Sequence, residues 1–391
     1  MNLGKLAEAH LKEKLLPFWA GLRDDRNGGF YGYMGYDLAL IADAPKGCIL
    51  NSRILWFFSR AYQATGDPET LALARQAYAF LQRFWDAESG GVYWSVTCDG
   101  RPLDTMKHTY AQAFAIYGLC AFGMAGGLAQ PLEQAMALYR LIETRMTDSV
   151  SCLEAFDRRF QPLSNAKLSD HPKLLAKGIV ADKTMNTLLH VLEAYTALHE
   201  ATGDAAVADS LRRLLRTVTQ RVYNQRLNRL EVFFDADMRS VLDMQSYGHD
   251  IEASWLIDLA ARRVLDGEAL AEATARTTAL AQGVYQRAYR SGSLLNEQVE
   301  GVIDDSRIWW VQAETLVGLT NLWQKTGDPA IREAMDAVWS YIMGNLVDPR
   351  AGSEWFNSVE PDGRPVPKPI VEPWKCPYHN GRMCLELMAR L

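Results

Sequence analysis

Apolar residues recur every three or four positions along most of this chain, which is the pattern of amphipathic helices. The first such stretch ends near Gly21, a second spans about Asn51 to Ala64, and a third runs from Pro68 to about Trp85. Further stretches with helical spacing cover residues 108–124, 130–146, 183–200, 206–223, 249–262, 268–290, 307–325, 329–345 and 379–390. The pattern predicts about twelve helices, and no low-complexity linker divides them.

A short turn motif recurs between these helices. It reads Ala-Thr-Gly-Asp-Pro at 64–68, Ala-Thr-Gly-Asp-Ala at 201–205 and Lys-Thr-Gly-Asp-Pro at 325–329. Glycine suits the end of one helix, aspartate the N-cap of the next, and proline its first turn. Each copy separates an aromatic-rich helix from an amphipathic helix that carries arginines, so the sequence indicates a repeated helical hairpin.

A second motif, Asp-Gly-Arg-Pro, occurs at 99–102 and 362–365, each time after residues that alternate as in a strand. This pattern predicts short β-hairpins, and the segment 230–235 resembles a third copy. The predicted unit is therefore helix, turn, helix and short hairpin.

About twelve helices in paired repeats favour a closed toroid over an open solenoid. We predict an all-α fold, an (α/α)6 barrel with short β-hairpins in its connecting loops, formed by residues 1–391 as one catalytic domain. In such a barrel the inner helices converge and the loops at one end form a funnel. A single site would then draw residues from many repeats.

Composition narrows the function classes. The net charge of -6 provides no basic surface for nucleic acid. No stretch reaches the ~18–20 apolar residues of a membrane span. The six cysteines form no C-x-x-C pair and no metal-ligand spacing. We therefore expect a soluble, cytoplasmic protein with neither a nucleic-acid nor a membrane partner.

Two histidines, His249 and His379, stand at predicted helix starts beside aromatic residues. The free N–H groups and dipole of a helix start lower the pKa of an imidazole, which can then act as a neutral base near pH 7. Two such bases in one cleft would suit proton abstraction and return at carbon. Glu252 follows His249 at i+3, which allows an oriented base, a surface capping pair or a metal site.

Polar residues also open other, otherwise apolar, helices. Arg53 and Tyr110 lie at two such starts, and Asn186 and His190 share a helix face at a third. Each alone is most often a cap or a buried polar residue. Together, at corresponding helix ends, they predict a polar cavity at one mouth of the barrel. His108 is either a further member of this set or a structural residue.

Tryptophans suggest the kind of ligand. The pair Trp309 and Trp310 and the single Trp374 lie among charged residues, where flat rings can stack on the C–H faces of a pyranose. Packing in the core is the alternative for each of them. Beside three histidines, the aromatic residues favour a sugar.

The stretches 185–195, 247–255, 309–314 and 374–383 are similar to motifs of the cellobiose 2-epimerases in the N-acylglucosamine 2-epimerase superfamily. The resemblance runs from about Arg53 to Leu387 and implies an (α/α)6 barrel. We expect neither a cofactor nor a metal, since no nicotinamide motif is visible and neutral histidines with Arg53 could stabilise an enediolate without a cation. The resemblance departs at Leu188, where a histidine is expected, and at Val311, where a proline is expected. The resemblance implies catalytic residues at His190, His249 and His379, and substrate-binding residues at Arg53, Tyr110, Asn186, Glu252, Trp309, Trp310 and Trp374.

The resemblance also implies a reaction, the epimerisation at C2 of the reducing-end glucose of β-1,4-linked disaccharides. A C2 proton is acidic only beside the open-chain C1 aldehyde, so the sugar ring must open first. We expect His249 and His379 to exchange the C2 proton, Glu252 to orient His249, His190 to assist ring opening, and Arg53 to stabilise the cis-enediolate.

Other functions remain open from the sequence. A mannose 2-epimerase or aldose-ketose isomerase would share much of this site. A glycoside hydrolase on the same barrel would need two carboxylates, for which Glu297, Asp304 and Asp305 are candidates. A sugar-binding scaffold without catalysis would not need three histidines.

Overall fold

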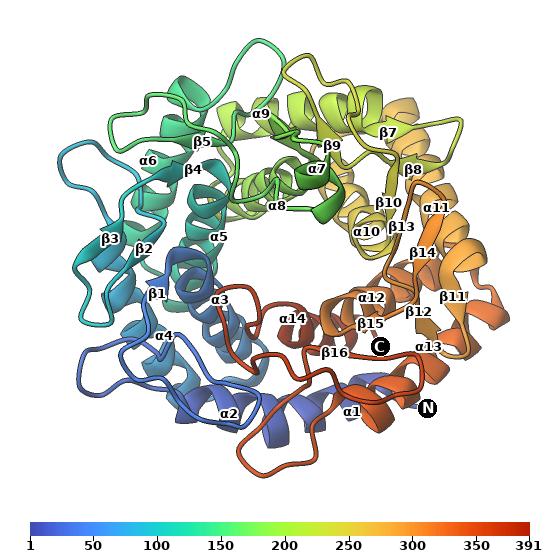
Figure 1. The fold of residues 1–391 in the computed structure, drawn as a ribbon, viewed down its shortest axis with the longest axis horizontal. Coiled ribbons are helices and arrows are strands. Elements are labelled where there is room, and N and C mark those ends of the chain that lie inside the picture. Colours follow the sequence, from blue (N-terminus) through green and yellow to red (C-terminus); the bar gives the residue numbers. More distant parts are fainter.

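The computed structural model describes residues 1–391, and the predicted helices form two concentric rings (Figure 1). The inner ring contains α3 (Cys48–Thr65), α5 (Thr109–Gly126), α8 (Met185–Thr202), α10 (Tyr247–Val264), α12 (Trp309–Thr326) and α14 (His379–Arg390). Each inner helix packs against the next, and α14 packs against both α12 and α3. The ring is therefore closed, and the predicted (α/α)6 barrel is confirmed.

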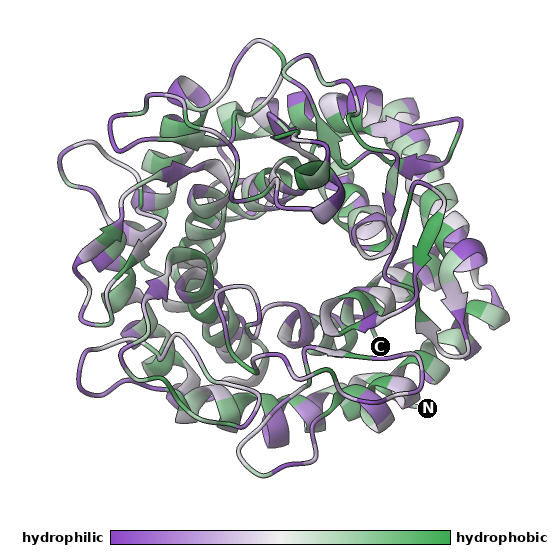
Figure 2. Ribbon diagram, viewed as in Figure 1, coloured by the Kyte–Doolittle hydropathy of each residue, from purple (hydrophilic) through white to green (hydrophobic).

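The outer ring covers the inner one. It contains α1 (Leu3–His10) and α2 (Leu16–Gly21), joined by a π-helical turn, and α4 (Pro68–Leu81), α6 (Ala129–Arg145), α9 (Ala205–Thr217), α11 (Gly267–Ala288) and α13 (Pro329–Tyr341). Helix α5 is buried on nearly every side, as a helix that is apolar all round must be. Hydrophilic residues gather instead on the loops and on the outer helices (Figure 2). None of the helices combines the length and apolar character that crossing a membrane would need.

The turns between paired helices have the predicted chemistry. Gly66, Gly203 and Gly327 adopt φ values of 70°, 65° and 66°, which end α3, α8 and α12 in the left-handed region. The aspartate directly after each of these glycines is the N-cap of the next helix, and its side chain accepts from backbone N–H groups in the first turn of that helix. The repeated motif therefore serves as a joint between an inner and an outer helix.

Short antiparallel strands lie at one end of the barrel. They are β1 (Lys46–Gly47), β2 (Ser95–Val96), β3 (Pro102–Asp104), β4 (Lys107–His108), β5 (Ala155–Phe156), β6 (Lys183–Thr184), β7 (Tyr223–Asn224), β8 (Arg229–Leu230), β9 (Phe233–Phe234), β10 (Met244–Ser246), β11 (Tyr289–Arg290), β12 (Ser293–Leu294), β13 (Glu297–Val299), β14 (Val302–Asp304), β15 (Arg307–Ile308) and β16 (Ser358–Val359). The predicted hairpin turns are present, with Val96 paired to Pro102 and Val359 bridged to Pro365.

The strands fix where the inner helices begin. Strands β1, β4, β6, β10 and β15 each end at the residue immediately before α3, α5, α8, α10 and α12. Their pairing holds the first turns of these helices at one mouth of the barrel, which is where the polar residues of the sequence motifs lie. The short helix α7 (Pro172–Ala176) and the hairpin formed by β13 and β14 were not predicted.

Candidate active site

A cavity of about 270 Å³ lies at the mouth where the inner helices begin. Every site residue expected from the sequence lines it. The lining comprises Arg53, Tyr110, Asn186, His190, His249, Glu252, Trp309, Trp310, Trp374 and His379, with Ile308, Asn357, Glu372 and Lys375 added by the structure. Residues from all six inner helices and from the segment before α14 thus meet in one place.

The three histidines of the cavity share one arrangement. Nδ1 of His190 lies 2.9 Å from Oε2 of Glu193, and Nδ1 of His379 lies 2.8 Å from Oε1 of Glu314. Nδ1 of His249 lies 2.8 Å from a hydroxyl oxygen, that of Ser246. In each ring Nε2 makes no hydrogen bond with the protein. Each imidazole is therefore oriented through one nitrogen and keeps the other for a ligand in the cavity.

The expected partnership between Glu252 and His249 is wrong. Glu252 follows His249 by three residues, but its Oε1 accepts a hydrogen bond from the Arg382 guanidinium and lies 3.9 Å from Nδ1 of His379. Both side chains are buried, where a charge without a partner is costly, and the carboxyl group of Glu252 pairs with the Arg382 guanidinium. His249 therefore takes its orientation from Ser246.

A buried charge cluster forms the floor of the cavity. Arg382 donates to Glu193, to Glu252 and, at 2.6 Å, to Glu314. Tyr378 donates to Glu193 at 2.6 Å. All these side chains are almost completely buried, so one guanidinium ties together carboxylates from α8, α10 and α12. The cluster fixes the two carboxylates that hold His190 and His379.

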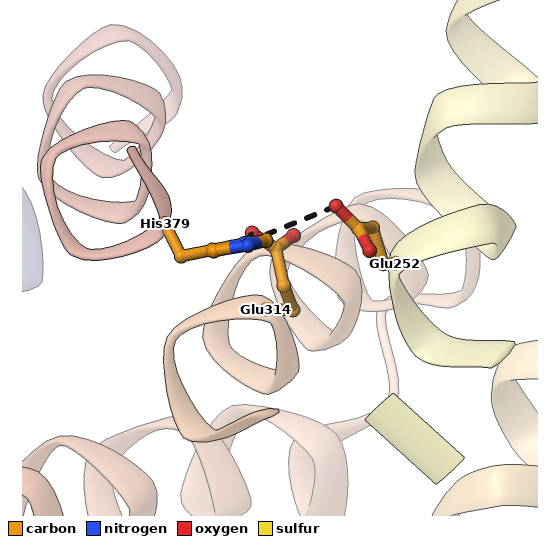
Figure 3. Close-up of side chains that lie close together, drawn as sticks. All are labelled: Glu252, Glu314 and His379. Carbon is orange, nitrogen blue, oxygen red and sulfur yellow. Dashed lines mark hydrogen bonds and ion pairs between the residues drawn. The ribbon is translucent and has the colours of Figure 1, made fainter. Parts of the chain in front are cut away.

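Glu252, Glu314 and His379 converge from three different helices (Figure 3). Their ligand atoms lie within 4.8 Å of one another, a spacing that a divalent cation could bridge. However, Arg382 already donates to both carboxylates of this set, and His379 uses Nδ1 on Glu314. In this structure the two carboxylates therefore bind a guanidinium.

Burial tunes the protonation of these groups. It lowers the pKa of His249 to about 3, and it also lowers the pKa of His190. Burial, together with the charge of Arg382, lowers the pKa of His379 well below its ordinary value. Burial also raises the pKa of Glu252 to about 8. The imidazoles therefore rest in the neutral form that can accept a proton.

Arg53 supplies a fixed positive charge. Its guanidinium lies 4.1 Å from the ring centre of Phe114 and 4.6 Å from that of Tyr378, and it donates to the Tyr110 hydroxyl at 3.0 Å. The Nε atom has no partner, and neither do the buried Oδ1 of Asn186 and Oε2 of Glu252. Unsatisfied buried polar atoms are costly, so a ligand that bonds to them would bind favourably.

The tryptophans differ in what they offer to a ligand. Trp310 packs on His249 at 4.7 Å between ring centres and on His379 at 5.4 Å, and part of it remains accessible. Trp309 is only 3% exposed and lies beneath the ammonium of Lys375. Trp374 is 36% exposed at the rim, beside Tyr110. Trp310 and Trp374 therefore present more surface for stacking than Trp309.

The remaining histidines considered lie elsewhere. His108 accepts from the backbone N–H of Tyr110 and contacts Asn165, so it caps α5 and is structural. The carboxylates suggested for a hydrolase, Glu297, Asp304 and Asp305, do not line the cavity. Glu297 instead lies 3.3 Å from His171.

Two orienting carboxylates were missed, for different reasons. Glu193 follows His190 by three residues on the same helix face, so the spacing could have indicated it. Glu314 and its partner His379 lie 65 residues apart, and only the closed ring brings them together.

The chain is similar to known proteins over nearly its whole length. The family model for N-acylglucosamine 2-epimerase matches residues 29–381. Cellobiose 2-epimerase from Eubacterium cellulosolvens is 45% identical over 97% of this chain and 96% of its own length, and that from Dictyoglomus turgidum is 43% identical over 98% and 97%. The solved cellobiose 2-epimerase from Bacillus thermoamylovorans B4167 superposes with a TM-score of 0.96 at 40% identity, over 100% of both chains. A solved D-mannose isomerase at 20% identity shares the fold, with a TM-score of 0.87 over 99% of this chain and 98% of its own.

Proposed function

The chain belongs to the N-acylglucosamine 2-epimerase family and is an isomerase, and from this premise we propose that it is a cellobiose 2-epimerase. In this proposal it interconverts glucose and mannose at the reducing end of β-1,4-linked disaccharides such as cellobiose, lactose and mannobiose. The observation that carries the proposal is the set of three imidazoles with Nδ1 bound to protein and Nε2 left for one cavity. This arrangement provides general acids and bases on more than one side of a bound sugar.

The reaction begins with ring opening. His190, held by Glu193, takes the O1 proton on Nε2 and delivers a proton to the ring oxygen O5, so that the C1–O5 bond breaks and the open-chain aldehyde forms. The aldehyde at C1 then makes the proton on C2 acidic. Opening the ring next to the charge cluster keeps the linear sugar in contact with Arg53 and Asn186, whose Nε and Oδ1 atoms lack protein partners.

Proton exchange at C2 follows. One of His249 and His379 enters neutral and takes the C2 proton on Nε2, which leaves a cis-enediolate with negative charge on its oxygens. The Arg53 guanidinium stabilises that charge. The other histidine takes up a proton from water and returns it to the opposite face of C2, directly or after rotation about C2–C3, and the first histidine releases its proton to water. One proton thus enters the pair as one leaves it, and C2 is inverted.

The outer sugar has a place at the rim. The exposed ring of Trp374 and the accessible part of Trp310 provide apolar faces for a second pyranose. We propose the cytoplasm as the location, since all six cysteines are free.

Product analysis in heavy water tests the proposal. The protein is incubated with cellobiose, lactose, mannose and glucose, the products are separated, and deuterium at C2 is measured. We expect glucosyl-mannose from cellobiose to form faster than mannose from glucose, with solvent deuterium at C2. Turnover of free monosaccharides alone would favour a mannose 2-epimerase or aldose-ketose isomerase, and retention of the original C2 hydrogen would remove His249 and His379 from their roles.

A further inference from the structure

The anchors of the three histidines are not chemically equal. His190 and His379 are held by carboxylates, whereas Nδ1 of His249 meets the uncharged hydroxyl of Ser246. Ser246 is the last residue of β10 and the N-cap residue of α10. A serine at this position usually accepts a hydrogen bond from a backbone N–H of the first helical turn. Here the side chain makes no such cap bond and is directed to the imidazole instead.

Thr184 shows the ordinary alternative in the same barrel. It is the N-cap of α8, and its hydroxyl accepts from the backbone N–H of Thr187 at 3.1 Å. Since α10 lacks this bond, helix capping does not account for the Ser246 hydroxyl. The hydrogen bond with His249 is the only one that it makes.

The surroundings make Ser246 a rigid support. Its side chain is buried, and its backbone pairs with Glu297 of β13. Trp310 also packs on the imidazole of His249, at 4.7 Å between ring centres. The ring of His249 is therefore held by one hydrogen bond and one aromatic contact.

We propose that Ser246 is a positioning residue that selects the tautomer of His249. Its Oγ accepts the hydrogen of Nδ1, which leaves the lone pair of Nε2 directed to the substrate. The opposite polarity, with the hydroxyl donating to Nδ1, would place the hydrogen on Nε2 and prevent this ring from acting as a base. The inference rests on the proposed function for its catalytic meaning, because it concerns the ring that exchanges the C2 proton.

A hydroxyl anchor has a further consequence. Unlike a carboxylate, it adds no negative charge that would stabilise an imidazolium. His249 therefore returns to the neutral state after each proton transfer, in agreement with the lowering of its pKa by burial.

Two measurements on Ser246→Ala test the role. We expect kcat on cellobiose to fall roughly 10–100-fold, the range found when a supporting residue is removed, with little change in KM. Ser246→Thr, which keeps the hydroxyl, should recover most of the activity. The ¹⁵N shifts of labelled histidine, assigned with His249→Asn, should show Nδ1–H in the native protein and a shift toward Nε2–H in Ser246→Ala.

Asp204→Ala is the matched control, because it removes a conventional N-cap from the outer helix α9, whose N-cap aspartate bonds two backbone N–H groups. It should lower the melting temperature without lowering kcat. Ser246→Ala should instead lower kcat without lowering the melting temperature. Native kcat in Ser246→Ala, or a loss of kcat with an unchanged tautomer, would overturn the proposal. Absence of solvent deuterium in the product of the native protein would instead overturn the proposed function, and the tautomer measurement would still decide the role of Ser246.

Discussion

Replacing Arg382 by methionine should strongly destabilise the protein. The arginine side chain is 1% exposed and is the shared partner of Glu193, Glu252 and Glu314. Methionine has a similar length but no charge, so the substitution leaves a group of buried carboxylates without their cation. The cost of that change is electrostatic, because little volume is lost.

The magnitude follows from the geometry. Removing one partner of a buried ion pair typically costs about 3–5 kcal/mol, because the remaining charge is left without compensation. Here Glu193 stays ionised at neutral pH, whereas burial raises the pKa values of Glu252 and Glu314, so we expect a loss within that range. Domains have a total stability of about 5–15 kcal/mol, so the variant should fold but unfold at a much lower denaturant concentration.

The loss should depend on pH. In the native protein, Arg382 is the largest favourable influence that lowers the pKa of Glu193 to about 2, below its value of 4.5 in the unfolded chain. That contribution to stability is complete above pH 4.5 and is lost as the pH falls toward 2. Without Arg382, burial should raise the pKa of Glu193 above 4.5, so that protonation on acidification stabilises the folded variant. The difference between variant and native protein should therefore be larger at pH 7 than at pH 5.

Urea unfolding followed by circular dichroism at both pH values provides the measurement. Arg382→Lys is the control, since it keeps a positive charge but cannot bridge the carboxylates as a planar guanidinium does. It should lose less stability than Arg382→Met at pH 7. A loss below 1 kcal/mol for Arg382→Met, or an equal loss at pH 5 and pH 7, would refute the reasoning.

Three further outcomes are expected. His249→Asn and His379→Asn should each lower epimerisation by at least ~10²–10⁴-fold in a product-separation assay, and a smaller loss in either would assign the C2 proton to another group. Exhaustive chelation should leave the activity intact, because Arg382 occupies the position of a cation between Glu252 and Glu314; loss of activity that a divalent metal restores would contradict this. Because burial lowers the pKa of His249 to about 3, kcat/KM should not decline as the pH falls through 6.5, and an acid limb centred near 6.5 would show that the base is an ordinary, solvated histidine.

Much of the fold could be predicted from local sequence patterns. The joints at Gly66, Gly203 and Gly327 could be predicted because helix ends depend on neighbouring residues in the chain. The hairpin of β13 and β14 could not, since Val302 and Ile303 are exposed and provide no alternation of buried and exposed positions. Helix α7 was missed because it is only five residues long.

Only part of the candidate site could likewise be predicted from the sequence. Ten of the residues that line the cavity were predicted, because they lie within recognisable motifs and most of them stand near a helix start, although their catalytic roles remain proposals. The partners that orient them were mostly not predicted. Ser246 was within a quoted motif, but its sequence position indicates a helix cap, and only the structure shows its hydroxyl on His249.

Ring closure has a consequence for biosynthesis. Helix α14 follows every other helix in the chain, yet it fills the gap between α12 and α3, and it brings His379 into the cavity and Arg382 into the charge cluster beneath it. A nascent chain that has not yet released this segment from the ribosome can pair its earlier helices. It cannot, however, form the ion pairs of Glu193, Glu252 and Glu314, because all three use Arg382 of α14. A chain without α14 would therefore have an open ring of inner helices, and it would lack both a cavity histidine and the arginine that joins α8, α10 and α12.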